Sequence, residues 1–170
     1  MEDKLVYDGW LKVYSREVNG RRYDILKNYD AVSAIILNEL NEILLVKQFR
    51  PAYMKETLEI PAGCLDVEGE SIENCLAREI KEETNIEVSP ESLEKIIEYK
   101  PIMGFSTSTM TIFKTVIKQE SLKSNKVNDA DVTEALWMPF KEFEKNILEG
   151  NINDSKTLMS YYYLKSSKKS

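Results

Sequence analysis

The stretch that decides the fold is Gly63-Cys-Leu-Asp-Val-Glu-Gly-Glu70, followed by Ser71 to Ala77 and then by Arg78-Glu-Ile-Lys-Glu-Glu-Thr-Asn-Ile86. It predicts a loop, then a helix, and then the C-terminal end of that helix. Ser71 is a suitable N-cap because its hydroxyl can accept a hydrogen bond from a free N–H in the first turn. Asn85 tolerates the left-handed conformation with which helices often end. The predicted helix therefore begins after Ser71 and ends before Asn85.

The inward side of this predicted helix begins apolar and becomes acidic. Four apolar side chains share that side: Ile72, Cys75, Leu76 and Ile80. At about 100° per residue, Glu79 and Glu83 fall on the same azimuth one or two turns later. Glu79, Glu82 and Glu83 repel each other at spacings of three and four residues, so a cation should compensate them. A solvated acidic face is the alternative, but the alignment with the apolar stripe favours oxygen-ligated Mg²⁺ or Mn²⁺.

This stretch resembles the signature of the Nudix hydrolase family, G-x(5)-E-x(7)-R-E-U-x-E-E-x-G-U, in which U is a bulky aliphatic residue. The matching residues are Glu70, Arg78, Glu79, Ile80, Glu82, Glu83 and Ile86. Two positions depart from the signature. Six residues rather than five separate Gly63 from Glu70, and Asn85 stands where the family has Gly. The insertion lies in the loop and Asn can replace Gly at a helix end, so the resemblance holds.

The resemblance implies a divalent-metal site, with Mg²⁺ or Mn²⁺ as the cofactor. The expected ligands are the carboxylates of Glu79, Glu82, Glu83 and Glu70 and the backbone carbonyl of Ala62. Glu82 and Glu83 are also expected to be catalytic. Arg78 is expected within the catalytic site, where it orients a carboxylate, either Glu59 or Glu79, by paired hydrogen bonds.

The composition is that of one soluble globular domain, with 170 residues, 42% hydrophobic and 31% charged. The formal net charge of −6 disfavours a nucleic-acid partner. The chain has no histidine, which excludes Ser-His and Cys-His catalysis and His-ligated zinc. Proton abstraction therefore falls to carboxylates.

Cysteine usage and hydropathy indicate a cytoplasmic protein without a membrane partner. Cys64 and Cys75 are too few and too oddly placed for a disulfide framework. No apolar run has the length of a membrane span, and the first residues lack the features of a signal peptide. We expect a reducing compartment, and Cys75 in the core.

The rest of the chain predicts a mixed α/β or α+β fold. Residues 11–18 and 22–27 read as strands joined through Asn19-Gly20, which favours a tight hairpin. Further strands are expected at residues 31–37, 42–49, 58–62, 93–99, 110–117 and 135–138, and helices at 140–149 and 155–164. The expected organisation is an N-terminal antiparallel ribbon (1–28), a catalytic domain (29–165) and a disordered tail (166–170).

A second resemblance is to the ADP-ribose pyrophosphatase subfamily of Nudix hydrolases. It rests on Ile43-Leu-Leu-Val-Lys-Gln-Phe-Arg-Pro51, Leu58-Glu-Ile-Pro-Ala-Gly63, Gly104-Phe-Ser106 and residues 152–157. It implies an α/β/α sandwich with a mixed sheet and a homodimer formed through the N-terminal strands. It also implies a small nucleoside diphosphate derivative as substrate, ADP-ribose first, cut to AMP and ribose 5-phosphate. The alternatives are another nucleotide-sugar such as GDP-mannose, or a catalytically silent regulatory module that binds one.

Two departures from the subfamily affect substrate and mechanism. Thr107 and Ser108 stand where the subfamily usually has an acidic pair. The loop that is usually Glu-rich offers three candidate bases with no preference among them: Asp129, Asp131 and Glu134. The choice of base is therefore open.

Three residues are expected to bind substrate. Arg50 ends a strand near the box, where its planar fork suits a diphosphate, with a surface salt bridge as the alternative. Gln48 points to the same face by the period of two. Phe105 could stack on a base, although such aromatic residues also serve as core or interface.

Overall fold

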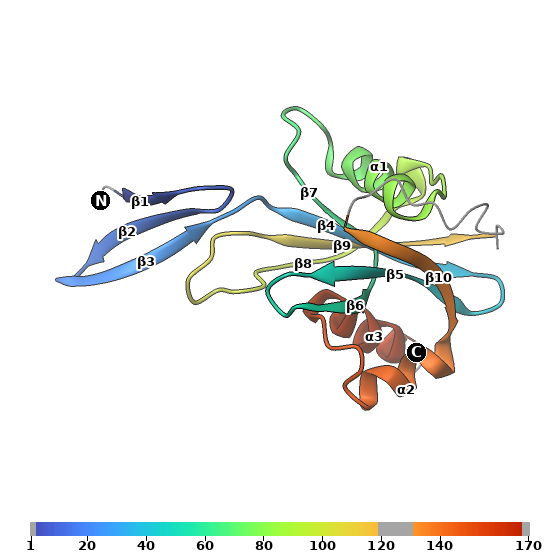
Figure 1. The fold of residues 1–170 in the computed structure, drawn as a ribbon. Helices are drawn as coiled ribbons and strands as arrows, with labels where there is room; N and C mark the ends of the chain where they lie inside the picture. The colour runs from blue at the N-terminus through green and yellow to red at the C-terminus, as the bar shows by residue number, and fades with distance from the viewer. Residues whose placement is uncertain (1–2, 119–130, 168–170) are drawn as a thin grey trace.

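The computed structural model describes residues 3–118 and 131–167. It shows a three-stranded sheet at the N-terminus and a seven-stranded sheet between helices (Figure 1). No helix among the described residues is long and apolar enough to cross a bilayer.

The N-terminal sheet contains one strand more than the sequence predicted. Its strands are β1 (Lys4–Asp8), β2 (Lys12–Val18) and β3 (Arg21–Lys27), all antiparallel. Asn19 and Gly20 have φ angles of 52° and 75°, as the predicted tight hairpin requires. The added strand β1 is fixed by Asp3, which accepts a hydrogen bond from Arg16 at 2.7 Å. This sheet extends away from the rest of the chain in Figure 1.

The larger sheet is mixed, as predicted. Its strands are β4 (Ala31–Asn38), β5 (Glu42–Arg50), β6 (Lys55–Glu59), β7 (Ala62–Cys64), β8 (Glu94–Tyr99), β9 (Met110–Ile117) and β10 (Val132–Pro139). Five of them run in the order β10-β5-β4-β9-β8, while β6 pairs with β5 and β7 pairs with β4. Only the β4–β9 pair is parallel among the described strands.

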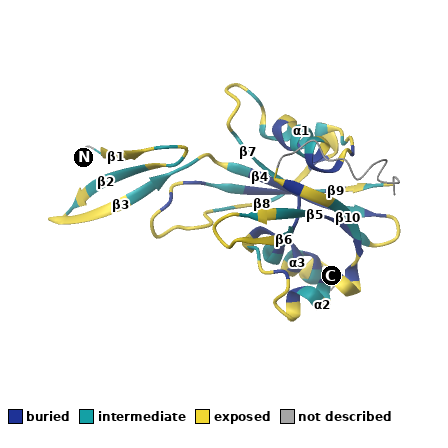
Figure 2. Ribbon diagram, in the orientation of Figure 1, coloured by how far each residue is buried: buried dark blue, intermediate teal, exposed yellow. Residues whose placement is uncertain are grey.

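Helices cover both faces of this sheet because its central strands are apolar on both sides. Along β4, Val32, Ala34 and Ile36 pack against α1 (Ile72–Thr84). Ile35 points the other way, into the core formed with α2 (Phe140–Leu148) and α3 (Ser155–Ser167). A period of two thus distributes one strand between two cores. Buried residues are concentrated at this sheet, whereas the N-terminal sheet is largely exposed (Figure 2). The expected α/β/α sandwich is confirmed.

The predicted strand at residues 58–62 is two strands. β6 ends at Glu59 and β7 begins at Ala62, so the ladder breaks at Ile60 and Pro61. Pro61 has no N–H with which to continue a ladder, and the chain changes partner there from β5 to β4. This change of partner brings the start of the box against α1.

The last helix is longer than predicted. α3 continues through Ser167, so the first two residues of the expected tail are helical. Residues 168–170 lie outside the described residues.

Candidate active site

α1 has the ends that the sequence predicts. The Ser71 hydroxyl accepts a hydrogen bond from the Asn74 N–H at 3.2 Å. Asn85 adopts a left-handed φ of 58°, and its N–H donates to the Lys81 carbonyl at 2.9 Å. Cys75 is buried, as expected, and so is Glu83 on the same side of the helix. The inward stripe therefore changes from apolar to acidic along the helix.

Arg78 holds three carboxylates of the box together. It donates to Glu70 from Nε and Nη2, at 3.3 and 3.1 Å, and from Nη1 to Glu79 at 2.9 Å and to Glu82 at 3.2 Å. Of the two partners expected for Arg78, Glu79 is therefore bonded. Glu59 is not, because it belongs to a second network described below. The extra residue between Gly63 and Glu70 is absorbed in the loop, where Gly69 has a φ of 81°.

The strand before the box lies directly against α1. The Ala62 N–H donates to Glu83 Oε2 at 3.1 Å, and the Glu83 side chain is 3% exposed. A Cβ added to Gly63 would lie 2.1 Å from Cγ of Glu79 and 2.2 Å from its Cδ. Any larger residue at position 63 would therefore displace the Glu79 side chain.

The carboxylates of this cluster differ in acidity because their surroundings differ. Burial raises the pKa of Glu79, and the charge of Arg78 only partly offsets that effect. The hydrogen bond from Arg78 lowers the pKa of Glu70. In turn, the hydrogen bond to Glu70 raises the pKa of Arg78. Arg78 is the cation that the structure places among these mutually repelling carboxylates.

The donors that surround this cluster suit a hard divalent ion. They are carboxylate oxygens on one helix face beside an extended backbone, and the chain has no histidine. The nearby Cys75 Sγ accepts from Arg78 Nη2 at 3.6 Å, and burial raises the pKa of its thiol, so the donor set favours Mg²⁺ or Mn²⁺ over zinc. No group of three acidic side chains converges on a common point among the described residues. Arg78 instead bridges Glu70, Glu79 and Glu82. The chemistry of these donors suits Mg²⁺ or Mn²⁺, whereas their arrangement in the structure is one around a guanidinium.

A second charged network lies beneath the β5–β6 hairpin. Glu59, 2% exposed, accepts from Arg50 Nε at 2.7 Å and also pairs with Arg50 Nη2 and the buried Lys156. Burial alone would raise the pKa of Glu59, but the Arg50 hydrogen bond and the Lys156 charge outweigh it and lower the pKa to about 2. Thr157 Oγ1 accepts from the Ile60 N–H at 3.0 Å. The N-terminus of α3 is thereby fixed to the strand that leads into the box.

The other predicted site residues lie in three places. Gln48 lies on β5, where it is paired with Thr57 of β6 on one side and with Val132 of β10 on the other. Phe105 lies in a turn, and its side chain is 51% exposed. Its backbone carbonyl accepts a hydrogen bond from the Leu26 N–H of β3 at 2.7 Å. Asp131 and Glu134 are exposed at the start of β10, and Asp129 lies outside the described residues. Their roles stay predictions.

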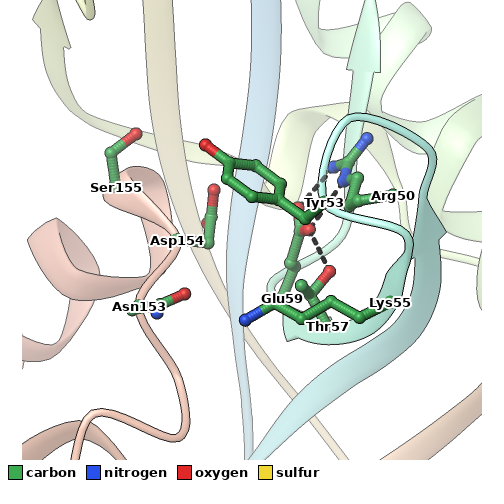
Figure 3. A pocket seen from close by; sticks show the side chains of 8 residues that line it. All are labelled: Arg50, Tyr53, Lys55, Thr57, Glu59, Asn153, Asp154 and Ser155. Carbon is green, nitrogen blue, oxygen red and sulfur yellow. Dashed lines mark hydrogen bonds and ion pairs between the residues drawn. The ribbon is translucent and has the colours of Figure 1, made fainter.

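Sequence reasoning missed a cavity of about 450 Å³ beside Arg50 (Figure 3). It is lined by Arg50, Tyr53, Lys55, Thr57, Glu59, Asn153, Asp154 and Ser155. These residues come from the β5–β6 hairpin and from the start of α3. No sequence motif predicts that the β5–β6 hairpin and residues 153–155 lie side by side.

Comparison with known proteins gives a family and several relatives. The model of the NUDIX domain matches residues 27–161. An ADP-ribose pyrophosphatase of Mycobacterium tuberculosis is 27% identical over 133 residues, which are 78% of this chain but only 63% of that enzyme. A methanol dehydrogenase activator of Bacillus methanolicus is 31% identical over 83% of this chain and 75% of its own length. A GDP-mannose pyrophosphatase of Yersinia enterocolitica is 34% identical over 71% of this chain and 65% of its own length.

These comparisons agree with the box geometry. The resemblance to ADP-ribose pyrophosphatases is confirmed by relatives in two bacteria, since a Bacillus subtilis enzyme of that name is 26% identical over 86% of this chain and 78% of its own length. The pyrophosphatase relatives support a Nudix pyrophosphatase as the class of enzyme. Because the family model covers most of the sequence, this chain belongs to the Nudix hydrolase family.

Proposed function

We propose that this protein hydrolyses the pyrophosphate bond of a nucleoside diphosphate linked to a sugar, with Mg²⁺ or Mn²⁺ as cofactor. The observation that carries the proposal is the carboxylate cluster of α1, held by Arg78 and facing the backbone at Gly63. ADP-ribose is the first candidate substrate, with AMP and ribose 5-phosphate as products. Its support is the similarity to two ADP-ribose pyrophosphatases.

The chain's own residues would have distinct tasks in this reaction. Glu79, Glu82, Glu83 and Glu70, with the Ala62 carbonyl, would hold the metal. A bound divalent ion supplies activation of water and neutralisation of the charge that develops on phosphate. Arg78 would hold the carboxylates of Glu79 and Glu82 in place by hydrogen bonds, against their mutual repulsion. Asp129, Asp131 or Glu134 would accept the proton from the attacking water.

The test is turnover of ADP-ribose with Mg²⁺ or Mn²⁺, followed by separation of AMP and ribose 5-phosphate. Glu82→Gln and Glu83→Gln should each lower kcat/KM by more than about a hundredfold, which corresponds to about 2.7 kcal/mol of lost transition-state stabilisation. Glu98→Gln is the matched control, because Glu98 is an exposed residue of β8 paired only with Lys95 among the described residues. Unchanged turnover in both box variants would remove the metal assignment.

The terminal sugar is expected to be discriminated only modestly. Of the two residues that stand in place of an acidic pair, Thr107 is exposed, and Ser108 is buried and hydrogen-bonded to Ser106 at 3.0 Å. Neither carries the charge that an acidic pair would bring. We expect ADP-ribose to lead ADP-glucose and GDP-mannose by less than about a hundredfold in kcat/KM. A lead of several thousandfold would contradict this expectation.

Two further properties are proposed. The first is a homodimer, supported by the exposed Leu5, Val6, Tyr7 and Trp10 of the N-terminal sheet. The second is activation of a partner enzyme, supported by the similarity to the methanol dehydrogenase activator. Activation of a dehydrogenase that persists undiminished in Glu82→Gln would favour a purely regulatory role. Activation lost together with hydrolysis would favour an effect of catalysis.

A further inference from the structure

The segment between β6 and β7 leaves the sheet just before the box begins. Ile60 and Pro61 belong to neither strand, and Ile60 is fully buried. A buried N–H without an acceptor costs free energy comparable to a lost hydrogen bond. Because Ile60 lies outside both ladders, its N–H has to find an acceptor elsewhere in the fold.

Thr157 of α3 supplies that acceptor. Its Oγ1 accepts from the Ile60 N–H at 3.0 Å and donates its own proton to Asp154 Oδ2 at 2.7 Å. A hydroxyl has one proton and two lone pairs, so the bond to Asp154 leaves a lone pair for Ile60. Asp154 is itself fixed, because it accepts from the Thr157 N–H at 3.0 Å and pairs with the buried Lys156 at 3.1 Å. The fully buried Thr157 side chain is thus held in one orientation.

The residues that follow Ile60 connect this bond to the carboxylate cluster. The Pro61 carbonyl accepts from the Ala34 N–H of β4 at 3.0 Å. The Ala62 N–H donates to Glu83 Oε2 of α1 at 3.1 Å. Three consecutive residues are therefore held by α3, by β4 and by α1 in turn.

The backbone at residues 62 and 63 fits closely against α1. Glu83, which accepts from the Ala62 N–H, is buried. Gly63 lies so near the Glu79 side chain that an added Cβ would be 2.1 Å from its Cγ. A shift of this backbone would therefore change the hydrogen bond to Glu83 and the contact with Glu79 together.

Resting on the proposed function, we infer that Thr157 is a positioning residue for the active site. Its hydroxyl fixes residues 60–62, and these residues present the Ala62 backbone to Glu83 and to the metal site. Thr157 acts through Ile60 and Ala62 and is not itself a ligand of the metal. Loss of the hydroxyl should therefore weaken divalent-metal binding although every carboxylate of the box is still present.

Calorimetric binding of Mn²⁺ to the full chain without substrate tests this role. Thr157→Val keeps the shape of the side chain but removes the hydroxyl, so Mn²⁺ affinity should fall about three- to tenfold, the effect of one hydrogen bond. Thr157→Ser keeps the hydroxyl and should stay within about twofold of the wild type. Thr115→Val is the matched control, because Thr115 of β9 is also buried and its Oγ1 donates to Ser92 Oγ at 3.2 Å.

Turnover of ADP-ribose separates positioning from a loss of stability. Thr157→Val and Thr115→Val each lose a buried hydrogen bond, so both should unfold at a lower temperature than the wild type. Only Thr157→Val should need a higher Mn²⁺ concentration for half-maximal kcat, by about three- to tenfold, with the KM for ADP-ribose within about twofold of the wild type. A merely structural role would not produce this difference between the two valine variants.

Amide hydrogen exchange of the wild type gives a measurement that needs no variant. Coupling between two sites is reciprocal, so if opening of the bond between Ile60 and Thr157 weakens metal binding, bound metal opposes that opening by the same factor. Saturating Mg²⁺ should therefore slow exchange of the Ile60 amide about three- to tenfold more than exchange of the Thr115 amide.

The outcomes separate this inference from the proposed function. Mn²⁺ affinity of Thr157→Val within about twofold of the wild type, an equal loss in Thr157→Ser or Thr115→Val, or equal slowing of both amides by Mg²⁺ would overturn the positioning role. If no nucleotide-sugar is cut and Thr157→Val still weakens Mn²⁺ binding selectively, the positioning role stands and the proposed hydrolysis fails. If ADP-ribose is cut and Thr157→Val binds Mn²⁺ like the wild type, the hydrolysis stands and the positioning role fails.

Discussion

Glu59→Gln is expected to remove a pH-dependent contribution to stability that is unusual for a single carboxylate. Glu59 is 2% exposed and is held by Arg50 and by the buried Lys156. These partners lower its pKa from the ordinary 4.5 to about 2, after burial has acted in the opposite direction. That lowering corresponds to about 3 kcal/mol in favour of the folded state. It is an upper figure, because solvent screens the partly exposed Arg50.

The sign of the pH dependence follows from the direction of the shift. A carboxyl group whose pKa is lowered by folding stabilises the protein above its unfolded value of 4.5, and the stabilisation is lost as the pH falls toward about 2. Glutamine resembles the protonated acid in shape and charge. The difference between wild type and Glu59→Gln should therefore be at most about 3 kcal/mol at pH 7 and should shrink by up to about 2 kcal/mol by pH 3.

Urea unfolding followed by circular dichroism at pH 7, 5, 4 and 3 measures this difference. Glu98→Gln, in an exposed pair, reports how much a surface carboxylate contributes under the same conditions. A difference for Glu59→Gln that changes by less than about 1 kcal/mol between pH 7 and pH 3 would refute the reasoning.

Two further predictions concern the box and the assembly. Gly63→Ala should lower the free energy of unfolding by about 1–3 kcal/mol and abolish most turnover, because the alanine Cβ would overlap the Glu79 side chain, which Arg78 holds in place. Thermal unfolding and kcat measure these two effects. Full activity of the variant would contradict the proposed contact. Trp10→Glu should convert the proposed dimer to monomer in light scattering with unchanged circular dichroism, because Trp10 is 72% exposed in the connection between β1 and β2. A full dimer would show that this surface is not the interface.

Local patterns of the sequence predicted most of the fold. The ends of α1 follow from a hydroxyl at Ser71 and from the tolerance of Asn85 for a positive φ, both of which are properties of single residues. The two-sided burial of β4 follows from alternation within eight residues. The third N-terminal strand was missed because β1 is short and exposed at every position, so it carries no alternation of burial.

The sequence by itself determined the box, its capped helix and the repulsion among its carboxylates, because these depend on spacings of a few residues along one helix. Tertiary structure decided which charges meet. Glu59 pairs with Lys156 across 97 residues, and Ile60 bonds to Thr157 over the same separation. Contacts between residues this far apart in sequence form only when strands and helices pack together, so the spacing of residues along the chain does not predict them.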